Sequence, residues 1–137
     1  MASIVFDTGE LDKFAKQMEK TSKRFRTRQK SFMRKEGNKL KTKTVRQARS
    51  IGKKTGNYLK SIKRGKVYKY DGAQAVRVYS TAPHAHLIED GHRMVTHDGR
   101  EVGFVKGHHV FEVAGKAFEP QYLMDIDNLL DEAVKEL

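Results

Sequence analysis

Residues 10–52 contain no proline and place their large apolar residues at helical spacing, and this run constrains the fold most. A helix of 43 residues would be about 64 Å long at ~1.5 Å per residue, longer than a globule of this size is wide. Gly37-Asn38 leaves open one helix or two in sequence, and Asp7 or Thr8 is expected to cap the start. The apolar side is thin, so we expect neighbouring subunits to help stabilise it. Its first members are Leu11, Phe14, Met18, Phe25 and Phe32.

Positive charge gathers in the same part of the chain. Residues 13–69 carry 22 Lys and Arg against two acidic residues, a net charge of +20. Residues 119–137 carry six acidic residues against Lys135, a net charge of −5. The two segments could pair within one chain or between subunits, while a positive helix face could equally be solvated or contact DNA, RNA or an acidic protein.

Beyond residue 65 the apolar pattern changes to a period of two, which predicts strands. Asp71-Gly72 and Asp98-Gly99 are expected to form type I′ turns of two hairpins, giving an antiparallel β-sheet between residues 65 and 107. Pro120 suits the first position of a C-terminal helix within 109–136.

We expect the C-terminal helix to pack into the core of the domain through Leu123, Ile126, Leu130 and Val134. The order of elements predicts one α+β domain over residues 1–137. It comprises a long N-terminal α-helix (a basic arm, 10–52), a small antiparallel β-sheet and a C-terminal α-helix.

Candidate chemistry is sparse. The chain has no cysteine, which excludes disulfides and thiolate metal sites and fits a reducing compartment. No stretch matches a membrane span or a signal peptide, so we expect a soluble protein. His84 and His86 on a strand would share a face near Glu89, but no established zinc spacing occurs. We therefore expect no catalytic site, no cofactor and no metal.

Three segments together resemble the HK97-type tail-component family of tailed phages and prophages. The first follows the basic helix, the second runs from Ala-Pro to Gly-His-Arg, and the third leads into the last helix. An aromatic residue that usually precedes Ala-Pro is replaced here by Tyr79-Ser80-Thr81. The residues that carry the resemblance are Thr55, Gly56, Leu59, Ser61, Ile62, Ala82, Pro83, Glu89, Gly91, His92, Arg93, Gly107 and Phe111.

The resemblance implies a structural virion protein at the head–tail junction or tail end, a neck or tail-completion protein made in the host cytoplasm. It would form a homo-oligomeric ring, with six subunits expected, and contact head-connector and tail proteins, with non-specific contact to packaged DNA and none to membranes. The alternatives are a tail terminator ring, or a small basic nucleic-acid-binding protein or ribonuclease toxin. The arm that contacts the neighbouring subunit would use Phe14, Met18, Phe25 and Phe32.

Overall fold

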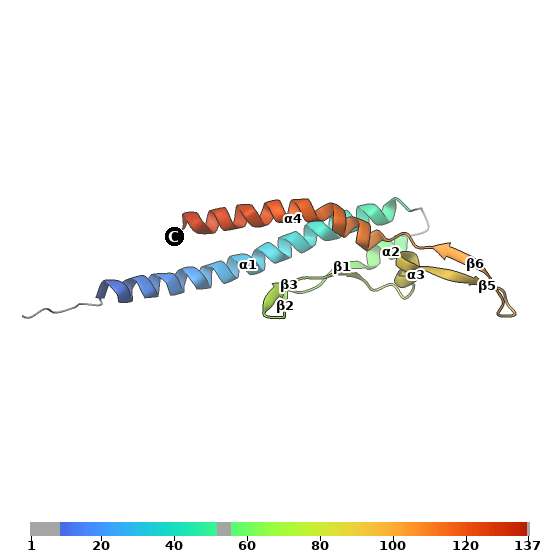
Figure 1. The fold of residues 1–137 in the computed structure, drawn as a ribbon, viewed down its shortest axis with the longest axis horizontal. Helices are drawn as coiled ribbons and strands as arrows, with labels where there is room; N and C mark the ends of the chain where they lie inside the picture. The colour runs from blue at the N-terminus through green and yellow to red at the C-terminus, as the bar shows by residue number, and fades with distance from the viewer. Residues whose placement is uncertain (1–8, 52–55, 137) are drawn as a thin grey trace, which may run out of the picture.

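Two long antiparallel helices form the body of the protein in a computed structural model that describes residues 9–51 and 56–136. They are α1 (Gly9–Arg49) and α4 (Val110–Lys135). The shorter elements lie along one side and at one end of the pair, and the molecule is elongated (Figure 1). The predicted α+β fold, with a long N-terminal helix, small antiparallel strands and a C-terminal helix, is confirmed.

Helix α1 is continuous through Gly37-Asn38, which settles the choice between one helix and two. Its 41 residues span about 62 Å at ~1.5 Å per residue. Gly37 is buried, and a Cβ atom there would lie 2.8 Å from Cδ of Arg64. A glycine therefore lets the first strand approach the helix closely. The expected caps, Asp7 and Thr8, lie outside the described residues.

The strands do not form the single sheet expected between residues 65 and 107. They form three separate two-stranded antiparallel ladders. The pairs are β1 (Ile62–Arg64) with β4 (Val78–Ser80), β2 (Tyr68–Tyr70) with β3 (Ala73–Ala75), and β5 (Gly91–Val95) with β6 (Glu101–Lys106). Pro83 follows β4 and has no N–H to continue a ladder, and the chain then turns into a helix. The last hairpin is therefore separated from the first two ladders.

Both Asp-Gly pairs lie in hairpin turns, but the turns differ. Asp71 and Gly72 have φ of 50° and 78°, as a type I′ turn requires. In the second hairpin Thr96 N–H donates to the Arg100 carbonyl at 2.9 Å, across a three-residue loop. Of the loop residues His97, Asp98 and Gly99, only Gly99 has a positive φ, of 86°. This is a type I turn followed by a left-handed residue, so the expected type I′ geometry at Gly99 is wrong.

Helix α3 (Ala85–Asp90) was not expected, and α4 is longer than expected. His84 lies in the turn before α3 and His86 within it, so the two rings do not share a strand face. Pro120 lies inside α4 rather than at its start. It leaves the Lys116 carbonyl without the usual helical donor, and α4 is visibly bent in Figure 1.

The core lies at the end where α1 finishes and α4 begins. Ala48, Tyr58, Ile62 and Val110 form its centre, each at most 5% exposed. Helix α2 (Gly56–Ser61) brings Tyr58 into this cluster. Packing around the centre involves Val45, Ile51, Leu59, Val78, Ala82, Ala85, Ile88 and Phe111. The first half of α1 and the β5–β6 hairpin therefore lie away from the core.

Candidate interaction surfaces

The apolar side of α1 is largely used inside the chain, because α4 packs along it. The rings of Phe32 and Tyr122 lie 6.3 Å apart, and those of Tyr122 and Phe118 lie 6.1 Å apart. Phe25 and Phe32 are half-buried, whereas Met18 is 43% exposed. The side chain of Phe14 lies outside the described residues. The predicted arm is thus bound to its own chain from Phe25 onward.

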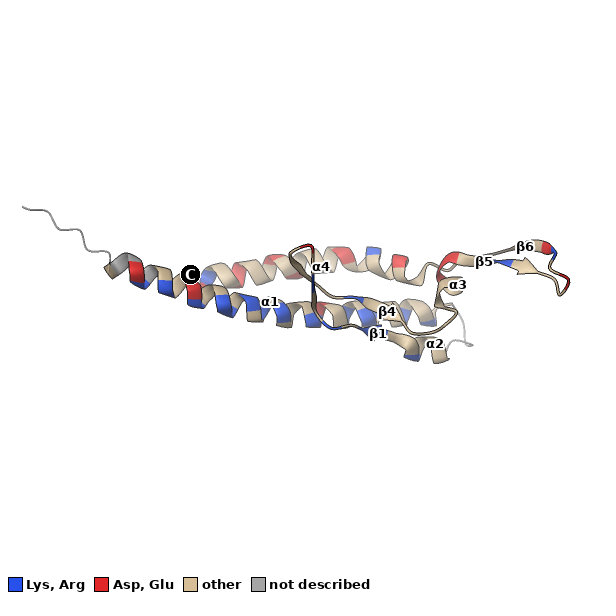
Figure 2. Cartoon of the chain, turned by 90° about the horizontal axis from the view of Figure 1, so that it is seen from below, with Lys and Arg blue, Asp and Glu red and all other residues tan. Residues whose placement is uncertain are grey.

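The opposite charges of the two long helices meet within the chain (Figure 2). Arg28 contacts Glu132 at 2.9 Å and Glu136 at 2.7 Å, and Lys39 contacts Asp125 at 2.8 Å. The charge pattern left open whether the basic and acidic segments pair within one chain or between subunits. These contacts lie within one chain. They also fix the antiparallel register of α1 against α4.

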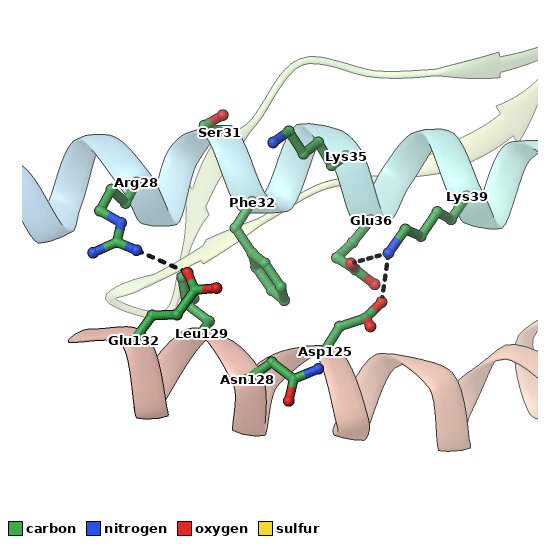
Figure 3. A pocket seen from close by; sticks show the side chains of 10 residues that line it. All are labelled: Arg28, Ser31, Phe32, Lys35, Glu36, Lys39, Asp125, Asn128, Leu129 and Glu132. Atoms are coloured by element: carbon green, nitrogen blue, oxygen red, sulfur yellow. Dashed lines mark hydrogen bonds and ion pairs between the residues drawn. The ribbon is translucent and has the colours of Figure 1, made fainter. Parts of the chain in front are cut away.

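A cleft of about 320 Å³ lies between α1 and α4, flanked by these ion pairs (Figure 3). Its cations Arg28 and Lys39 are held by the carboxylates of the facing helix. Phe32 and Leu129 line its wall. The cleft is a polar seam between the two helices, because Arg28 and Lys39 are paired with carboxylates of α4.

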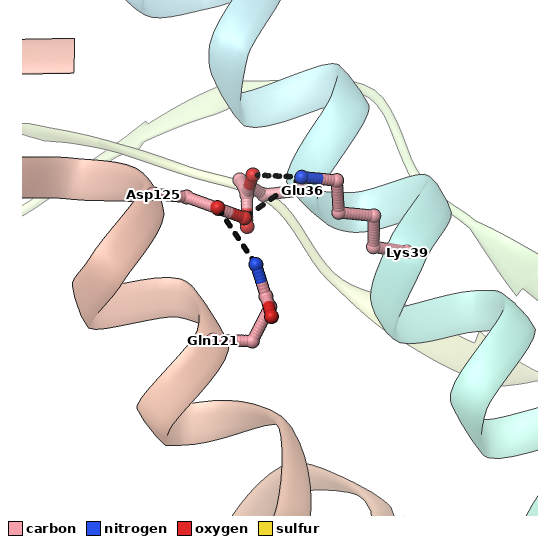
Figure 4. A network of polar contacts seen from close by, with 4 residues as sticks. All are labelled: Glu36, Lys39, Gln121 and Asp125. Atoms are coloured by element: carbon pink, nitrogen blue, oxygen red, sulfur yellow. Dashed lines mark hydrogen bonds and ion pairs between the residues drawn. The ribbon is translucent and has the colours of Figure 1, made fainter. Parts of the chain in front are cut away.

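Within this seam Glu36, Lys39 and Asp125 form a charged cluster (Figure 4). Lys39 Nζ lies 3.3 Å from Glu36 Oε1 and 2.8 Å from Asp125 Oδ2, and Gln121 Nε2 donates to Asp125 at 2.8 Å. Glu36 is 3% exposed, and its Oε2 has no hydrogen-bond partner. Burial, reinforced by Asp125, raises the pKa of Glu36 to about 7. The hydrogen bond from Lys39 lowers the pKa of Asp125.

Glu36 was not among the residues singled out from the sequence. The available signal was its isolation, because Glu19 and Glu36 are the only acidic residues within 13–69. Helical spacing also places Glu36 four residues after Phe32, on the side that faces α4. A protonated Glu36 can donate to Asp125, which makes it a titratable link between the two long helices.

The family-motif residues of the second and third segments meet at one junction. Both carboxylate oxygens of Glu89 accept the N–H of Phe111, at 2.8 and 2.9 Å, so Glu89 caps the start of α4. A Cβ atom on Gly107 would lie 2.3 Å from the Glu89 carbonyl oxygen. Gly91 has φ of 84°, and a Cβ atom there would lie 2.3 Å from the Val105 carbonyl oxygen. The junction therefore requires glycine at both positions.

The first motif segment lies in and beside the core of the fold. Ile62 is in the core, Leu59 packs against it, and Ser61 Oγ lies 2.6 Å from Ser80 Oγ. Gly56 begins α2, while Thr55 lies outside the described residues. Ala82 packs at the edge of the core. Pro83, His92 and Arg93 are exposed.

Residues 9–51 and 56–136 contain no group of three His, Asp or Glu side chains close enough to hold a metal ion. Among the described helices, none combines the length and the apolar composition that crossing a bilayer needs.

Among the described residues, exposed apolar side chains gather on the β5–β6 hairpin and on α4. The hairpin surface belongs to β5–β6 and consists of Met94 (43% exposed), Val95 (57%), Val102 (55%), Phe104 (60%) and Val105 (37%). The α4 stripe consists of Leu123 (53%), Leu130 (48%) and Val134 (66%). These three were expected in the core, and that expectation is wrong because α1 is a single helix that covers one side of α4. Ile126 is half-buried.

A family model described as "Bacteriophage HK97-gp10, putative tail-component" matches residues 12–91. The match covers more than half of the chain, from α1 to the first residue of β5. It includes the first motif segment and the second as far as Gly91, so His92 and Arg93 lie beyond it. No curated protein and no solved structure matches the chain. With this match and the confirmed order of elements, the chain belongs to the bacteriophage HK97-gp10 tail-component family.

Proposed function

We propose that this tail-component protein is a non-enzymatic ring subunit of the neck, completing the tail and joining it to the head connector. The subunit would be made in the host cytoplasm and incorporated into the virion. Six copies would match the symmetry of a phage tail. Head-connector and tail proteins would then be its partners on the two faces of the ring.

The observation that carries this proposal is the pair of exposed apolar surfaces on an elongated subunit. The hairpin surface and the α4 stripe lie toward opposite ends of the molecule (Figure 1). Contact between two different surfaces on successive copies is heterologous, and such contacts close into a ring when the rotation between copies allows it. A family whose members are tail components supplies the setting in which a ring is needed.

The exposed basic residues of α1 support a second, auxiliary role. They are spread along α1 (Figure 2). Lysine and arginine side chains bind phosphate without reading sequence, so a ring of such subunits could contact DNA passing through the junction.

Particles produced without this protein provide the test. We expect filled heads and tails that accumulate separately, with joining restored when purified protein is added to the extract. Tails of irregular length would instead indicate the terminator role. Normal, infectious particles would overturn the structural proposal and favour a small basic nucleic-acid-binding protein or nuclease.

A further inference from the structure

The β5–β6 hairpin lacks the support that a two-stranded ladder needs. It is anchored at its base, where the Ile88 and Glu89 carbonyls accept the N–H groups of His108 and His109, at 2.7 and 3.1 Å. Beyond this base it extends away from both long helices (Figures 1 and 2). An isolated hairpin is marginally stable in water. Exposed apolar side chains on both of its faces are typical of a protein interaction site.

Both faces of this hairpin are apolar, as its register shows. Met94 pairs with Gly103 and His92 with Val105, so Met94 and Val105 share one face. Phe104 pairs with Arg93 on the other face. Phe104 is the largest side chain of the hairpin surface and is 60% exposed. Large aromatic side chains that enter a pocket are the usual anchors of protein interfaces.

A matching acceptor lies toward the other end of the molecule. Met18 and Phe25 of α1, with Leu130 and Val134 of α4, line a shallow groove of about 230 Å³. Thr21, Ser22, Ala133 and Glu136 complete it. The groove is continuous with the α4 stripe, since Leu130 and Val134 belong to both. Four of its lining residues, Met18, Phe25, Leu130 and Val134, are large and apolar.

The hairpin and the groove of one chain cannot meet, because the hairpin points away from the body at the end opposite the C-terminus of α4 (Figure 1). We propose that the β5–β6 hairpin of one copy packs into the Met18–Phe25–Leu130–Val134 groove of a second copy, with Phe104 as its anchor. This contact deepens the proposed ring function and rests on it.

Charge supports a second copy of this chain as the occupant. The hairpin carries Arg93, Arg100 and Lys106 against Asp98 and Glu101, a net charge of +1. Asp127 and Asp131 lie beside the α4 stripe, exposed and without an ion pair to any described residue. Helical spacing places Asp127 in the same row as Leu123 and Leu130. Arg93 lies 3.9 Å from Glu101 within the hairpin, so Arg100 and Lys106 are the cations that would face Asp127 and Asp131 of a second copy.

Cross-linking tests this contact directly, because the chain has no native cysteine. Val102→Cys marks the hairpin and Ser22→Cys marks the groove. In concentrated solution with a short bismaleimide, we expect a cross-linked dimer when the two variants are mixed and none with either variant alone. A chain carrying both substitutions should give a ladder of oligomers. Tyr70→Cys, on the exposed β2–β3 hairpin, replaces Val102→Cys as the matched control and should not link to Ser22→Cys.

Absence of the mixed cross-link, or an equally strong link from Tyr70→Cys, would overturn the contact. A link between two Val102→Cys chains in place of the mixed product would also overturn it, since the interface would then be symmetric. Joining-defective particles without the mixed cross-link would leave the ring function in place and reject this surface. Cross-links from a protein that particles do not require would reject the ring function and keep the contact.

Anchor substitution gives an independent readout. We expect Phe104→Ser to weaken self-association in sedimentation at least about tenfold, because it removes the aromatic anchor. Leu130→Ser should act similarly from the groove side. Tyr70→Ser removes an aromatic side chain that is 70% exposed, and should leave self-association unchanged. Equal association of Phe104→Ser and the unsubstituted protein, with unchanged circular dichroism, would overturn the role of Phe104.

Discussion

The carboxyl group of Glu36 holds its proton more tightly in the folded protein than in the unfolded chain. Burial raises its pKa from the ordinary value of 4.5 to about 7. Stability from this group is therefore fully present below pH 4.5 and is lost as the pH rises through about 7. Glutamine resembles the protonated form, since it can donate to Asp125 and accept from Lys39. We expect Glu36→Gln to raise the unfolding free energy at pH 8 by on the order of 1–3 kcal/mol.

Urea unfolding between pH 5 and pH 8 measures this effect. The difference between Glu36→Gln and the unsubstituted protein should be small at pH 5 and grow toward pH 8. Glu19→Gln is the matched control, because Glu19 is exposed on the same helix. A difference that does not change with pH would contradict the buried, titrating role of Glu36.

Gly107 and Gly115 offer opposite outcomes for the same substitution. At Gly107 an alanine Cβ would meet the Glu89 carbonyl oxygen at 2.3 Å, so the backbone of the α3–β6 junction must move. We expect Gly107→Ala to destabilise the fold by about 1–3 kcal/mol. At Gly115, inside α4, nothing lies within 4 Å of the added Cβ. Gly115→Ala should stabilise it by ~0.5–1 kcal/mol. Thermal melts of both variants measure these changes. Similar shifts of Tm in the two variants would contradict this junction geometry.

At the scale of the elements, the start of α4 depends on a side chain from α3. Glu89 accepts the Phe111 N–H with both carboxylate oxygens and places a negative charge at the positive end of the helix dipole. We expect Glu89→Ala to destabilise the protein by about 1–2 kcal/mol. Glu112→Ala removes an exposed carboxylate from the first turn of the same helix, where it accepts no backbone N–H of the described residues, and should change stability less. Equal effects of the two substitutions in urea unfolding would show that Glu89 is no cap.

The elements that the sequence predicted are those with repeated local signals. The long run of helical spacing around Phe25 and Phe32 gave α1, and the two Asp-Gly pairs gave both hairpins. Helix α3 has six residues, too few to show a period, and it begins two residues after Pro83, a residue that indicated only a turn. Proline is over-represented at the first position of helices, but Pro120 lies inside α4, which bends (Figure 1).

The candidate surfaces were harder to predict, because they depend on which helix covers which side. An apolar stripe such as Leu123, Leu130 and Val134 has the same pattern whether it is buried or exposed. Only the folded arrangement shows that this stripe is exposed, because α1 borders it at Met18 and Phe25 without covering it. Similarly, Glu89 and Gly107 were identified through a family resemblance, yet their contact with each other depends on the path of β5 and β6 between them.

On the scale of the whole molecule, the opposite charges of α1 and α4 stabilise the subunit. The basic residues of α1 that do not pair with α4 form a positive surface. Acidic residues of α4 pair with Arg28 and Lys39, so these cations serve the fold. Other lysines and arginines of α1 are exposed to solvent (Figure 2). The subunit thus has a basic helix surface, an apolar hairpin and an apolar groove on different parts of one elongated body.

The exposed cations should bind DNA weakly and without sequence preference. Lys16, Lys20, Lys30 and Arg34 are exposed on α1. Replacing all four with glutamine should weaken binding to every duplex equally, and should reduce the slope of log K against log salt by up to about 0.9 per lost phosphate contact. The control variant carries four glutamines in place of Lys60, Lys66, Lys69 and Lys135, which are exposed elsewhere. It has the same net charge, so a smaller effect there would locate the DNA-binding surface on α1.

Fluorescence anisotropy over a range of salt concentrations measures both slopes. Equal losses in the two variants would reduce the interaction to net charge, and strong preference for one sequence at physiological salt would mean that α1 reads bases.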